Sequence, residues 1–256
     1  MGKPLILLDR DGVLNRLVID PEQGTIDSPL HPSQVQLLGG VAEALARLTA
    51  AGYGLAIVTN QPAWAKNKTT RANLEAVHEA VLAAATSAGG QVLSSHICFH
   101  RSEDGCECRK PRTGLLRAAF ARNPGYDIAA SWMVGDGITD MRAGVALQLR
   151  TAFLSAHKCD ACNILALNQV EPTFWGPDLP AFTDHLLSSV GQASRLSRSG
   201  TGVSPAPQRD RRDACPTSSS LFRLDPPWSA ITMQSRSGPW YGVIRKPRGS
   251  PPYPSC

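Results

Sequence analysis

The sequence predicts an α/β fold, in which a parallel sheet is flanked by helices. Two short runs, Leu5 to Leu8 and Leu55 to Val58, consist only of apolar residues, as is typical of central strands buried on both faces. Each run is followed by a segment whose apolar residues have helical spacing. This alternation of strand and helix is typical of an open α/β sheet.

The remaining elements follow in chain order from the same periods. The first helix is expected from Val41 to Ala51, where Gly52 ends it, and Thr69 or Thr70 is expected to cap a longer helix through Ala85. Beyond it we expect, in order, a strand at His96–Cys98, a helix at Thr113–Phe120, a strand at Trp132–Val134, a short helix after Thr139, a strand at Thr151–Leu154 and a closing helix from Leu179 to about Val190. Polar residues follow several of these strands directly, where open α/β sheets bind ligands.

The composition divides the chain into a domain at residues 1–190 and a tail at residues 191–256. The domain holds 16 Lys and Arg against 18 Asp and Glu, whereas the tail holds 10 against 3 and contains half of the 20 prolines. The domain is therefore near neutral and the tail is basic. The tail is rich in Pro, Ser and Arg and has no sustained period, which predicts disorder or a non-native reading frame.

Apolar runs and cysteines bear on where the protein resides. No apolar run approaches the roughly 18 residues of a membrane span, and Asp9 to Asp11 interrupt the apolar start before a signal sequence can form. Four of the first five of the seven cysteines lie in C-x-C or C-x-x-C spacings that suit a metal better than disulfides. Cys159 and Cys162 lack two further nearby ligands, so we expect them to be free thiols. These features predict a cytoplasmic protein without membrane contact.

The segment Asp9-Arg-Asp-Gly12 directly follows the first predicted strand. Two carboxylates two residues apart at a strand end project to the same side, where they can share a cation and a phosphate group. Phosphate monoesters hydrolyse so slowly without a catalyst that a covalent step and a metal are both expected. Asp9 would attack phosphorus, and Asp11 would protonate the leaving alkoxide and then deprotonate water. Taken alone, the tetrapeptide is also compatible with an ordinary turn.

Two later clusters supply groups that a phosphoryl group needs. Thr59, Asn60 and Gln61 follow the second strand and offer a hydroxyl and amides to phosphate oxygens. Lys110 would supply a positive charge against the pentavalent phosphoryl group. Each feature alone also occurs in a polar turn or on a solvated surface, so it is their order along the chain that favours a catalytic role.

A third cluster, Gly-Asp-Gly-Ile-Thr-Asp at residues 135–140, follows another predicted strand. Asp136 would complete a magnesium site, with oxygen ligands from Asp9 and from the backbone of Asp11. Asp140 would support that site through hydrogen bonds. The expected cofactor at the strand ends is therefore Mg²⁺.

Two closely spaced pairs of metal-ligand residues, Cys98 with His100 and Cys106 with Cys108, lie within eleven residues. Three thiolates and one imidazole make a closed tetrahedral set without a position for substrate, which predicts a structural Zn²⁺. The binding energy of such a site is sufficient to order the charged loop between the two pairs. The loop immediately precedes Lys110, so zinc would help to position that lysine.

In this order, the clusters resemble motifs I to IV of the haloacid dehalogenase superfamily of phosphatases. More narrowly, the chain is similar to the D-glycero-D-manno-heptose-1,7-bisphosphate 7-phosphatase and histidinol-phosphate phosphatase group, whose members carry a comparable zinc loop. The resemblance rests on LDRDGVLN at 8–15, TNQ at 59–61, CRKP at 108–111 and MVGDGITDM at 133–141. It covers residues 4–155 and, more weakly, extends to residue 190. It implies a Rossmann-like sheet with a minimal cap made of loops.

The resemblance also implies roles for individual residues. Asp9 corresponds to the nucleophile and Asp11 to the general acid and base. Thr59 and Lys110 correspond to residues that stabilise the phosphoryl group, and Arg109 to a residue that recognises the substrate. The implied partner is a small phosphorylated metabolite of carbohydrate metabolism, with the heptose bisphosphate, losing its 7-phosphate, as the first candidate and histidinol phosphate as the second.

Several departures from the group concern the substrate. Trp64 lies where the family has a small, glycine-containing segment, and it is expected to reshape the pocket. Gly137 replaces a lysine that often follows the third aspartate in the heptose enzymes. Residues 16–37 do not match the substrate loop of the family. The reaction class is therefore better defined than the substrate.

Two interpretations from other functional classes are retained. A polynucleotide 3′-phosphatase uses the same scaffold, and the basic tail could follow a nucleic-acid backbone, although the zinc loop disfavours nucleic acid. A zinc-stabilised binding protein with vestigial motifs is the non-enzymatic alternative, and the intact set of carboxylates disfavours it. A small cap is compatible with a monomer.

Overall fold

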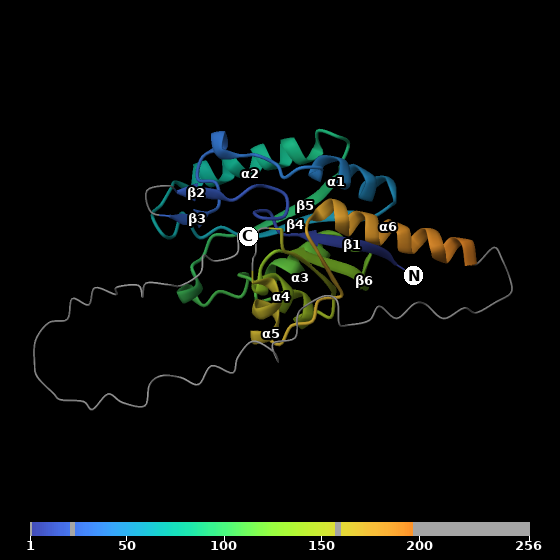
Figure 1. Cartoon of the computed structure of the whole chain (residues 1–256). Coiled ribbons are helices and arrows are strands. Elements are labelled where there is room, and N and C mark those ends of the chain that lie inside the picture. Colours follow the sequence, from blue (N-terminus) through green and yellow to red (C-terminus); the bar gives the residue numbers. More distant parts are fainter. Residues whose placement is uncertain (1, 21–23, 157–159, 197–256) are drawn as a thin grey trace, which may run out of the picture. The chain divides into compact units, whose positions relative to one another are not determined.

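The computed structural model describes residues 2–20, 24–156 and 160–196. Its main sheet has the strand order β5-β4-β1-β6-β7-β8, and every neighbouring pair is parallel (Figure 1). The strands are β1 (Lys3–Leu8), β4 (Gly54–Asn60), β5 (Val92–Cys98), β6 (Tyr126–Gly135), β7 (Arg150–Leu154) and β8 (Phe174–Gly176). The predicted α/β class and parallel sheet are confirmed.

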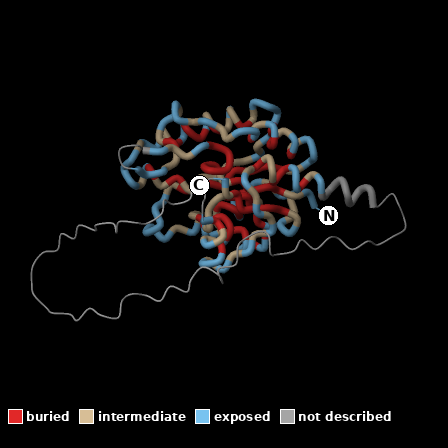
Figure 2. Tube along the Cα trace, viewed as in Figure 1, coloured by how far each residue is buried: buried red, intermediate tan, exposed pale blue. Residues whose placement is uncertain are grey.

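Helices cover both faces of this sheet (Figure 1). On one face, α1 (Val41–Ala50), α2 (Arg71–Thr86) and α6 (Leu179–Leu196) bury their apolar stripes against the strands. On the other face lie α3 (Gly114–Arg122), α4 (Ile138–Ala146) and α5 (Ala161–Leu167). The sheet thus separates two apolar cores, which appear as the buried interior in Figure 2.

Strand β1 lies between β4 and β6, and its sequence explains that place. Leu5 to Leu8 are all 0% exposed, because Ile6 and Leu8 pack into one core while Leu5 and Leu7 pack into the other. In register, Leu8 pairs with Ile57 of β4 and with Val134 of β6. The segments that follow these three strands therefore meet at one edge of the sheet.

The insertion between β1 and α1 contains a short hairpin that the sequence did not predict. Strands β2 (Val18–Asp20) and β3 (Thr25–Asp27) pair antiparallel, with Ile19 opposite Ile26. These two side chains are 68% and 65% exposed, so they lack the burial that makes an apolar alternation recognisable. The cap is thus small, as expected, but it includes paired strands as well as loops.

Other differences concern lengths and short elements. Strand β6 begins at Tyr126, earlier than predicted. The prediction missed its first half because residues 126–130 are only partly buried or exposed and form no continuous apolar run. Strand β8 and helix α5 are too short to show a period. Helix α6 continues to Leu196, past the domain boundary drawn at residue 190. The predicted tail beyond residue 196 lies outside the described residues.

Cysteine chemistry corrects one prediction. Cys162 takes part in a disulfide bond, so the expectation of a free thiol at this position was wrong. A C-x-x-C spacing without metal ligands nearby is equally compatible with oxidation, and the sequence pattern does not separate the two. Cys159 lies outside the described residues.

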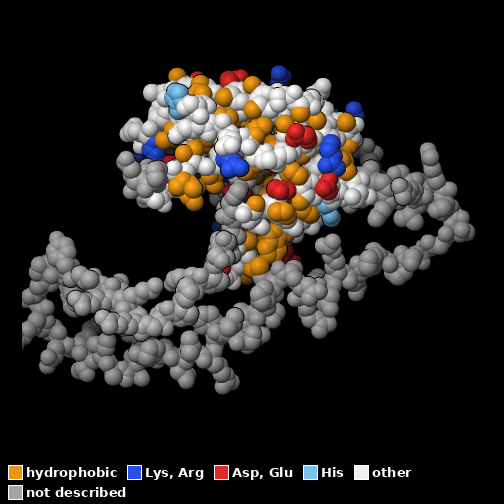
Figure 3. Space-filling view, turned by 45° about the horizontal axis from the view of Figure 1, so that its top comes forward, with side chains coloured by type: hydrophobic (Ala, Val, Ile, Leu, Met, Phe, Trp, Pro, Cys, Tyr) orange, Lys and Arg blue, Asp and Glu red, His pale blue; other side chains and the backbone are white. Residues whose placement is uncertain are grey.

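The described surface is mixed in character. On the face in Figure 3, acidic and basic side chains are interspersed with apolar ones rather than gathered by sign. Within the described ranges, no helix combines the length and apolar character that a membrane crossing requires.

Candidate active site

Asp9 occupies the first position after β1, at the edge where the three central strands end. Its backbone amide donates to the carbonyl of Val134 at 2.9 Å, which continues the pairing with β6 by one residue. Its Oδ1 accepts the backbone amide of Arg10 at 2.7 Å and lies 3.0 Å from Nζ of Lys110. The carboxylate is therefore held both by the neighbouring residue in the sequence and by Lys110 from a distant loop.

Lys110 supplies a positive charge beside Asp9, where the central strands end, and its side chain is only 2% exposed. Its Nζ lies 2.6 Å from Oδ1 of Asp140 and donates to the carbonyl of Val58 at 2.7 Å, in addition to its contact with Asp9. Burial disfavours the ammonium form, but the Asp140 and Asp9 carboxylates outweigh it and raise the pKa of Lys110. The lysine is thus charged at neutral pH.

Asn60 fixes the backbone of that lysine. Its side-chain oxygen accepts the Lys110 amide at 3.1 Å, and its side-chain nitrogen donates to the Lys110 carbonyl at 3.0 Å. Both polar atoms of the amide are therefore used on the protein itself. Asn60 was predicted to contact substrate, and in the structure it connects the end of β4 to the loop that carries Lys110.

Three carboxylates form a cluster that could hold a metal ion. One oxygen from each of Asp9, Asp136 and Asp140 lies within 4.8 Å of the others. Burial raises the pKa of Asp9 to about 6 and also raises that of Asp140; the neighbouring carboxylates add to this effect, and Lys110 opposes it. Carboxylate oxygens are the ligands that Mg²⁺ prefers, and a divalent cation would relieve this excess of negative charge.

Gly12 allows Asp136 to reach the cluster. It has a φ of +84°, which favours glycine, and a Cβ at this position would lie 2.5 Å from Oδ2 of Asp136. A side chain here would therefore displace the carboxylate. Gly137, where the heptose enzymes often have lysine, donates its amide to Oδ2 of Asp140 at 3.0 Å and so orients that residue.

The side chain of Asp11 is not part of the cluster of Asp9, Asp136 and Asp140 that could hold a metal ion. Its carboxylate contacts the fully buried guanidinium of Arg10, with Nη2 to Oδ2 at 2.8 Å. The amide nitrogen of Gln61 donates to the same Oδ2 at 2.7 Å and to Oγ1 of Thr59 at 2.9 Å. Thr59 and Gln61 are each 1% exposed, and of these two predicted phosphate-binding side chains Gln61 contacts Asp11 directly while Thr59 contacts Gln61.

The four predicted zinc ligands come together at the end of β5. The sulfur atoms of Cys98, Cys106 and Cys108 lie 3.3 to 3.7 Å apart. Nδ1 of His100 lies 3.6 Å from the sulfur of Cys98 and 3.3 Å from that of Cys108. A tetrahedral Zn²⁺ with Zn–S bonds of about 2.3 Å requires S···S separations of about 3.8 Å. The set therefore fits a closed tetrahedral metal site.

The loop that carries these ligands is braced from outside. Trp64 packs edge-on against Phe99, with ring centroids 6.3 Å apart. The guanidinium of Arg71 lies 4.9 Å from the centroid of Phe99, so an aromatic ring and a cation both contact the residue between two of the predicted zinc ligands. Trp64, which was expected to reshape the pocket, is 44% exposed and contacts this loop.

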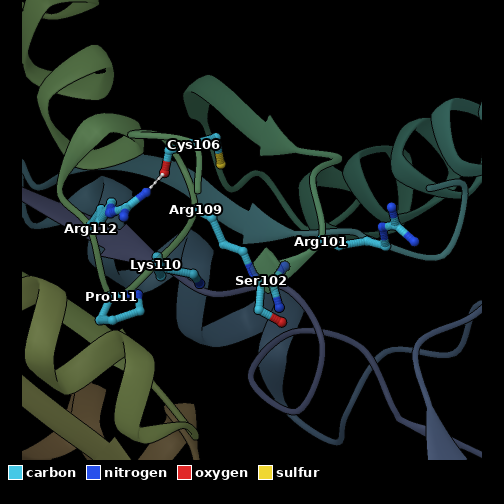
Figure 4. A pocket seen from close by; sticks show the side chains of 7 residues that line it. All are labelled: Arg101, Ser102, Cys106, Arg109, Lys110, Pro111 and Arg112. Carbon is cyan, nitrogen blue, oxygen red and sulfur yellow. Dashed lines mark hydrogen bonds between the residues drawn. The ribbon is translucent and has the colours of Figure 1, made fainter. Parts of the chain in front are cut away.

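A cavity of about 240 Å³ opens beside Lys110 and is lined mainly by cationic side chains. Figure 4 shows Arg109 extended from the loop towards Ser102, while Arg101 points away. Arg109 donates to the carbonyl of His100 at 3.1 Å, and Arg112 to that of Cys106 at 2.6 Å. The sequence indicated Arg109 but not Arg101 or Arg112. A cluster of arginines around C-x-C was the signal that could have identified them.

Proteins of known structure and sequence match this arrangement. Residues 107–182 match the model of the HAD-hydrolase-like family. A D-glycero-beta-D-manno-heptose-1,7-bisphosphate 7-phosphatase of Pseudomonas aeruginosa is 37% identical over 159 residues, which cover 62% of this chain and 84% of that protein. The enzyme of that name from Pseudomonas putida is 31% identical over 186 residues, which cover 72% of this chain and 99% of that protein.

A solved structure agrees with the sequence relatives. The D,D-heptose 1,7-bisphosphate phosphatase of Bordetella bronchiseptica, complexed with magnesium and phosphate, superposes with a TM-score of 0.61 at 30% identity, covering 73% of this chain and 99% of that one. The relative from Pseudomonas putida is matched over nearly its entire length, at an identity that is sufficient to establish common ancestry and a common reaction class. The chain therefore belongs to the haloacid dehalogenase-like phosphatases, in the family that includes these heptose-bisphosphate phosphatases.

Proposed function

We propose that the chain is a magnesium-dependent phosphomonoesterase that removes the 7-phosphate of D-glycero-β-D-manno-heptose 1,7-bisphosphate, as the names of its relatives state for those proteins. The observation that supports a bisphosphate is the cationic cavity of about 240 Å³ beside Lys110. One phosphoryl group would be held at Asp9, and the cavity would hold a second anion.

The residues divide the reaction between them. Asp9 attacks phosphorus and forms an aspartyl phosphate, while the leaving oxygen takes a proton from Asp11. In the second step Asp11 takes a proton from water as the water oxygen attacks phosphorus and the bond to Asp9 breaks. Lys110, close to Asp9, balances the charge that develops on the phosphoryl oxygens.

The metal would be held by Asp9, Asp136 and the backbone of Asp11, with Asp140 in support. When bound, Mg²⁺ supplies positive charge to the phosphoryl oxygens and reduces repulsion between the phosphate and the three carboxylates. Asp140 contributes without the metal as well, because it holds Nζ of Lys110 at 2.6 Å.

A structural Zn²⁺ is proposed for Cys98, His100, Cys106 and Cys108. The four ligands would fill its coordination sphere and fix the loop that leads to Arg109. The site needs Cys98, Cys106 and Cys108 as free thiols, as the structure has them, and a cytoplasmic location is proposed because it keeps thiols reduced, although Cys162 is oxidised. The phosphatase domain is proposed to comprise residues 1–190 together with the end of helix α6, which continues to Leu196.

Histidinol phosphate is the less favoured substrate of the same class. It carries one phosphate and a cationic amine, whereas the cavity is lined by Arg101, Arg109 and Arg112. Cations in such a pocket would repel the amine and attract a second phosphate. The same cations would suit a polynucleotide phosphate, so an oligonucleotide bearing a 3′-phosphate belongs in the test.

The decisive experiment compares substrates on the wild-type chain and on Arg109→Met. The wild type is expected to hydrolyse the heptose bisphosphate faster than histidinol phosphate or the 3′-phosphorylated oligonucleotide. Arg109→Met is expected to raise KM for the bisphosphate by roughly 10- to 100-fold, because a charge-assisted contact to the second phosphate is lost. KM for a sugar monophosphate is expected to change little.

The exposed Arg122, at the end of α3, offers a matched control as Arg122→Met. Equal changes in KM for mono- and bisphosphates in Arg109→Met would contradict the second anion site. Preference for histidinol phosphate would replace the proposed substrate.

A further inference from the structure

Arg10 lies between the two aspartates of the catalytic segment, and the proposed reaction gives it no role. It is a charged residue with 0% exposure, in direct contact with Asp11. Its Nη1 atom is buried and has no hydrogen-bond partner within the described part of the chain. A buried guanidinium that is incompletely paired costs stability, so a contribution to function would explain its presence.

The contacts of Asp11 differ strongly between its two oxygens. Oδ2 accepts Nη2 of Arg10 at 2.8 Å, Nε2 of Gln61 at 2.7 Å and Nε of Arg10 at 3.2 Å. Among the described residues, Oδ1 has only the contact with Nε of Arg10 at 3.2 Å and that with Nδ2 of Asn15 at 3.5 Å. One oxygen is therefore saturated by short contacts, whereas the other retains accepting capacity.

We propose that Arg10 and Gln61 are positioning residues that fix Asp11 through Oδ2 and leave Oδ1 as the atom that exchanges protons. This inference rests on the proposed phosphatase mechanism, in which Asp11 is the acid and base. In the first step, the proton on Oδ1 moves to the bridging oxygen as the bond from that oxygen to phosphorus breaks and the Asp9 oxygen bonds to phosphorus. In the second step, Oδ1 receives a proton from the attacking water as phosphate leaves Asp9.

The side-on geometry explains why arginine occupies this position. The Nε and Nη2 edge of the guanidinium faces the carboxylate and restricts its rotation, which the single ammonium of lysine does not do. Gln61 reaches the same oxygen from the end of β4, with its other donor contact on Thr59 at 2.9 Å. Two elements far apart in sequence thus set one rotamer of Asp11.

The test separates proton transfer from the other parts of catalysis. The heptose bisphosphate has an alkoxide leaving group that needs a proton, whereas p-nitrophenyl phosphate releases a stable phenolate that does not. General acid and base catalysis contributes roughly 10²- to 10⁴-fold, which sets the loss expected for Asp11→Asn on the alkyl substrate. Arg10→Lys and Gln61→Met are expected to lower the rate on the heptose bisphosphate by about 10-fold or more, because Asp11 is then less well positioned to transfer the proton.

On p-nitrophenyl phosphate, the same two variants are expected to retain the rapid first release of p-nitrophenolate, which reports attack by Asp9. The subsequent steady-state rate is expected to fall, because hydrolysis of the aspartyl phosphate still requires a base. Arg47→Lys alters an exposed ion pair with Asp184 and is the matched control. Zinc content and thermal unfolding check that each variant is folded, and Gln61→Met decides if Arg10→Lys does not fold.

Two results would overturn the inference while leaving the proposed function intact. One is that Arg10→Lys and Gln61→Met leave the ratio of activity on the heptose bisphosphate to activity on p-nitrophenyl phosphate unchanged, although Asp11→Asn lowers that ratio. The other is that both variants reduce the first release of p-nitrophenolate as much as the steady-state rate. If Asp11→Asn itself behaves as the wild type, the acid and base assignment fails, and this inference fails with it.

Discussion

Two clusters of side chains that could hold a metal ion occur in the described part of this protein, and they are built in opposite ways. The carboxylate cluster draws Asp9 from the end of β1 and both Asp136 and Asp140 from the segment after β6, and a buried lysine lies within it. The thiolate and imidazole cluster comes from a single loop of eleven residues, Cys98 to Cys108.

The difference separates chemistry from support. Carboxylates that follow two different strands share a buried lysine, and burial, together with the neighbouring carboxylates, raises the pKa values of Asp9 and Asp140. Three thiols and one imidazole on one loop could close a tetrahedron around a metal ion. The first arrangement can accept a phosphate and a divalent ion, whereas the second can only fix the shape of the loop.

Removing the nucleophile should give the largest effect on the carboxylate cluster. Asp9→Asn retains the shape of the side chain but cannot form an aspartyl phosphate, so phosphate release is expected to fall by at least roughly 10³-fold. Zinc content should not change. The measurement is magnesium-dependent phosphate release, with the exposed Asp184→Asn as the matched control. Activity close to that of the wild type would eliminate the covalent mechanism.

Gly12 and Gly52 provide a matched pair of glycine substitutions. Both have positive φ values, +84° and +86°, but only at Gly12 would a Cβ meet Asp136, while nothing lies within 4 Å of the Gly52 position. Both Gly12→Ala and Gly52→Ala should therefore lose about 1–2 kcal/mol of stability in urea unfolding. Only Gly12→Ala should also lose catalytic efficiency, by roughly 10²-fold, because Asp136 is displaced. Equal activity in the two variants would contradict the role assigned to that contact.

Breaking the zinc loop should have a smaller effect on activity. Cys106→Ser removes one thiolate, so zinc content is expected to fall and activity to decrease by about 10-fold, since the loop positions Lys110 and Arg109 but does not react. Metal analysis and phosphate release measure the two quantities, with Glu103→Gln as a control in the same loop. A loss as large as that of Asp9→Asn would mean that the loop takes part in the chemistry.

The pH dependence of stability should show the smallest effect. The folded protein raises the pKa of Asp9 from 3.8 to about 6, so the unfolded chain ionises first and folding is disfavoured as pH rises from about 4 to about 6. Without added magnesium, Asp9→Asn should thus be more stable than the wild type by about 1–3 kcal/mol at pH 7 and equally stable near pH 3. Urea unfolding across this range measures the difference, and a constant difference at all pH values would contradict the raised pKa.

The same contrast explains how far the sequence alone could predict the structure. The four predicted zinc ligands are close in sequence, so their spacing was sufficient to predict that they lie together. Asp9, Lys110 and Asp136 required the additional step that parallel strands end at one edge, and buried apolar runs supported that step. The sheet was predictable because its central strands are buried on both faces.

Features that depend on tertiary contacts could not be predicted. Nothing in the sequence distinguishes the fully buried Arg10 from a solvated arginine, since its burial depends on Asp11 and on packing from other elements. Asn60 and Gln61 were identified as polar residues at a strand end. Their partners, Lys110 and Asp11, each lie 50 residues away in the sequence, so the sequence did not indicate these contacts. The β2–β3 hairpin exposes its isoleucines and therefore lacks the usual strand signal.

The two hydrogen bonds between Asn60 and the backbone of Lys110 bear on enzyme engineering. They anchor the far end of the cysteine loop through main-chain atoms, so the attachment does not depend on which side chains the loop carries. Segments from relatives can thus be transplanted between residues 98 and 110 as a cassette, provided that the acceptor retains asparagine at position 60. Under the proposed function, such a transplant is expected to change substrate preference through the residue at position 109, while Asn60 still holds the backbone of Lys110.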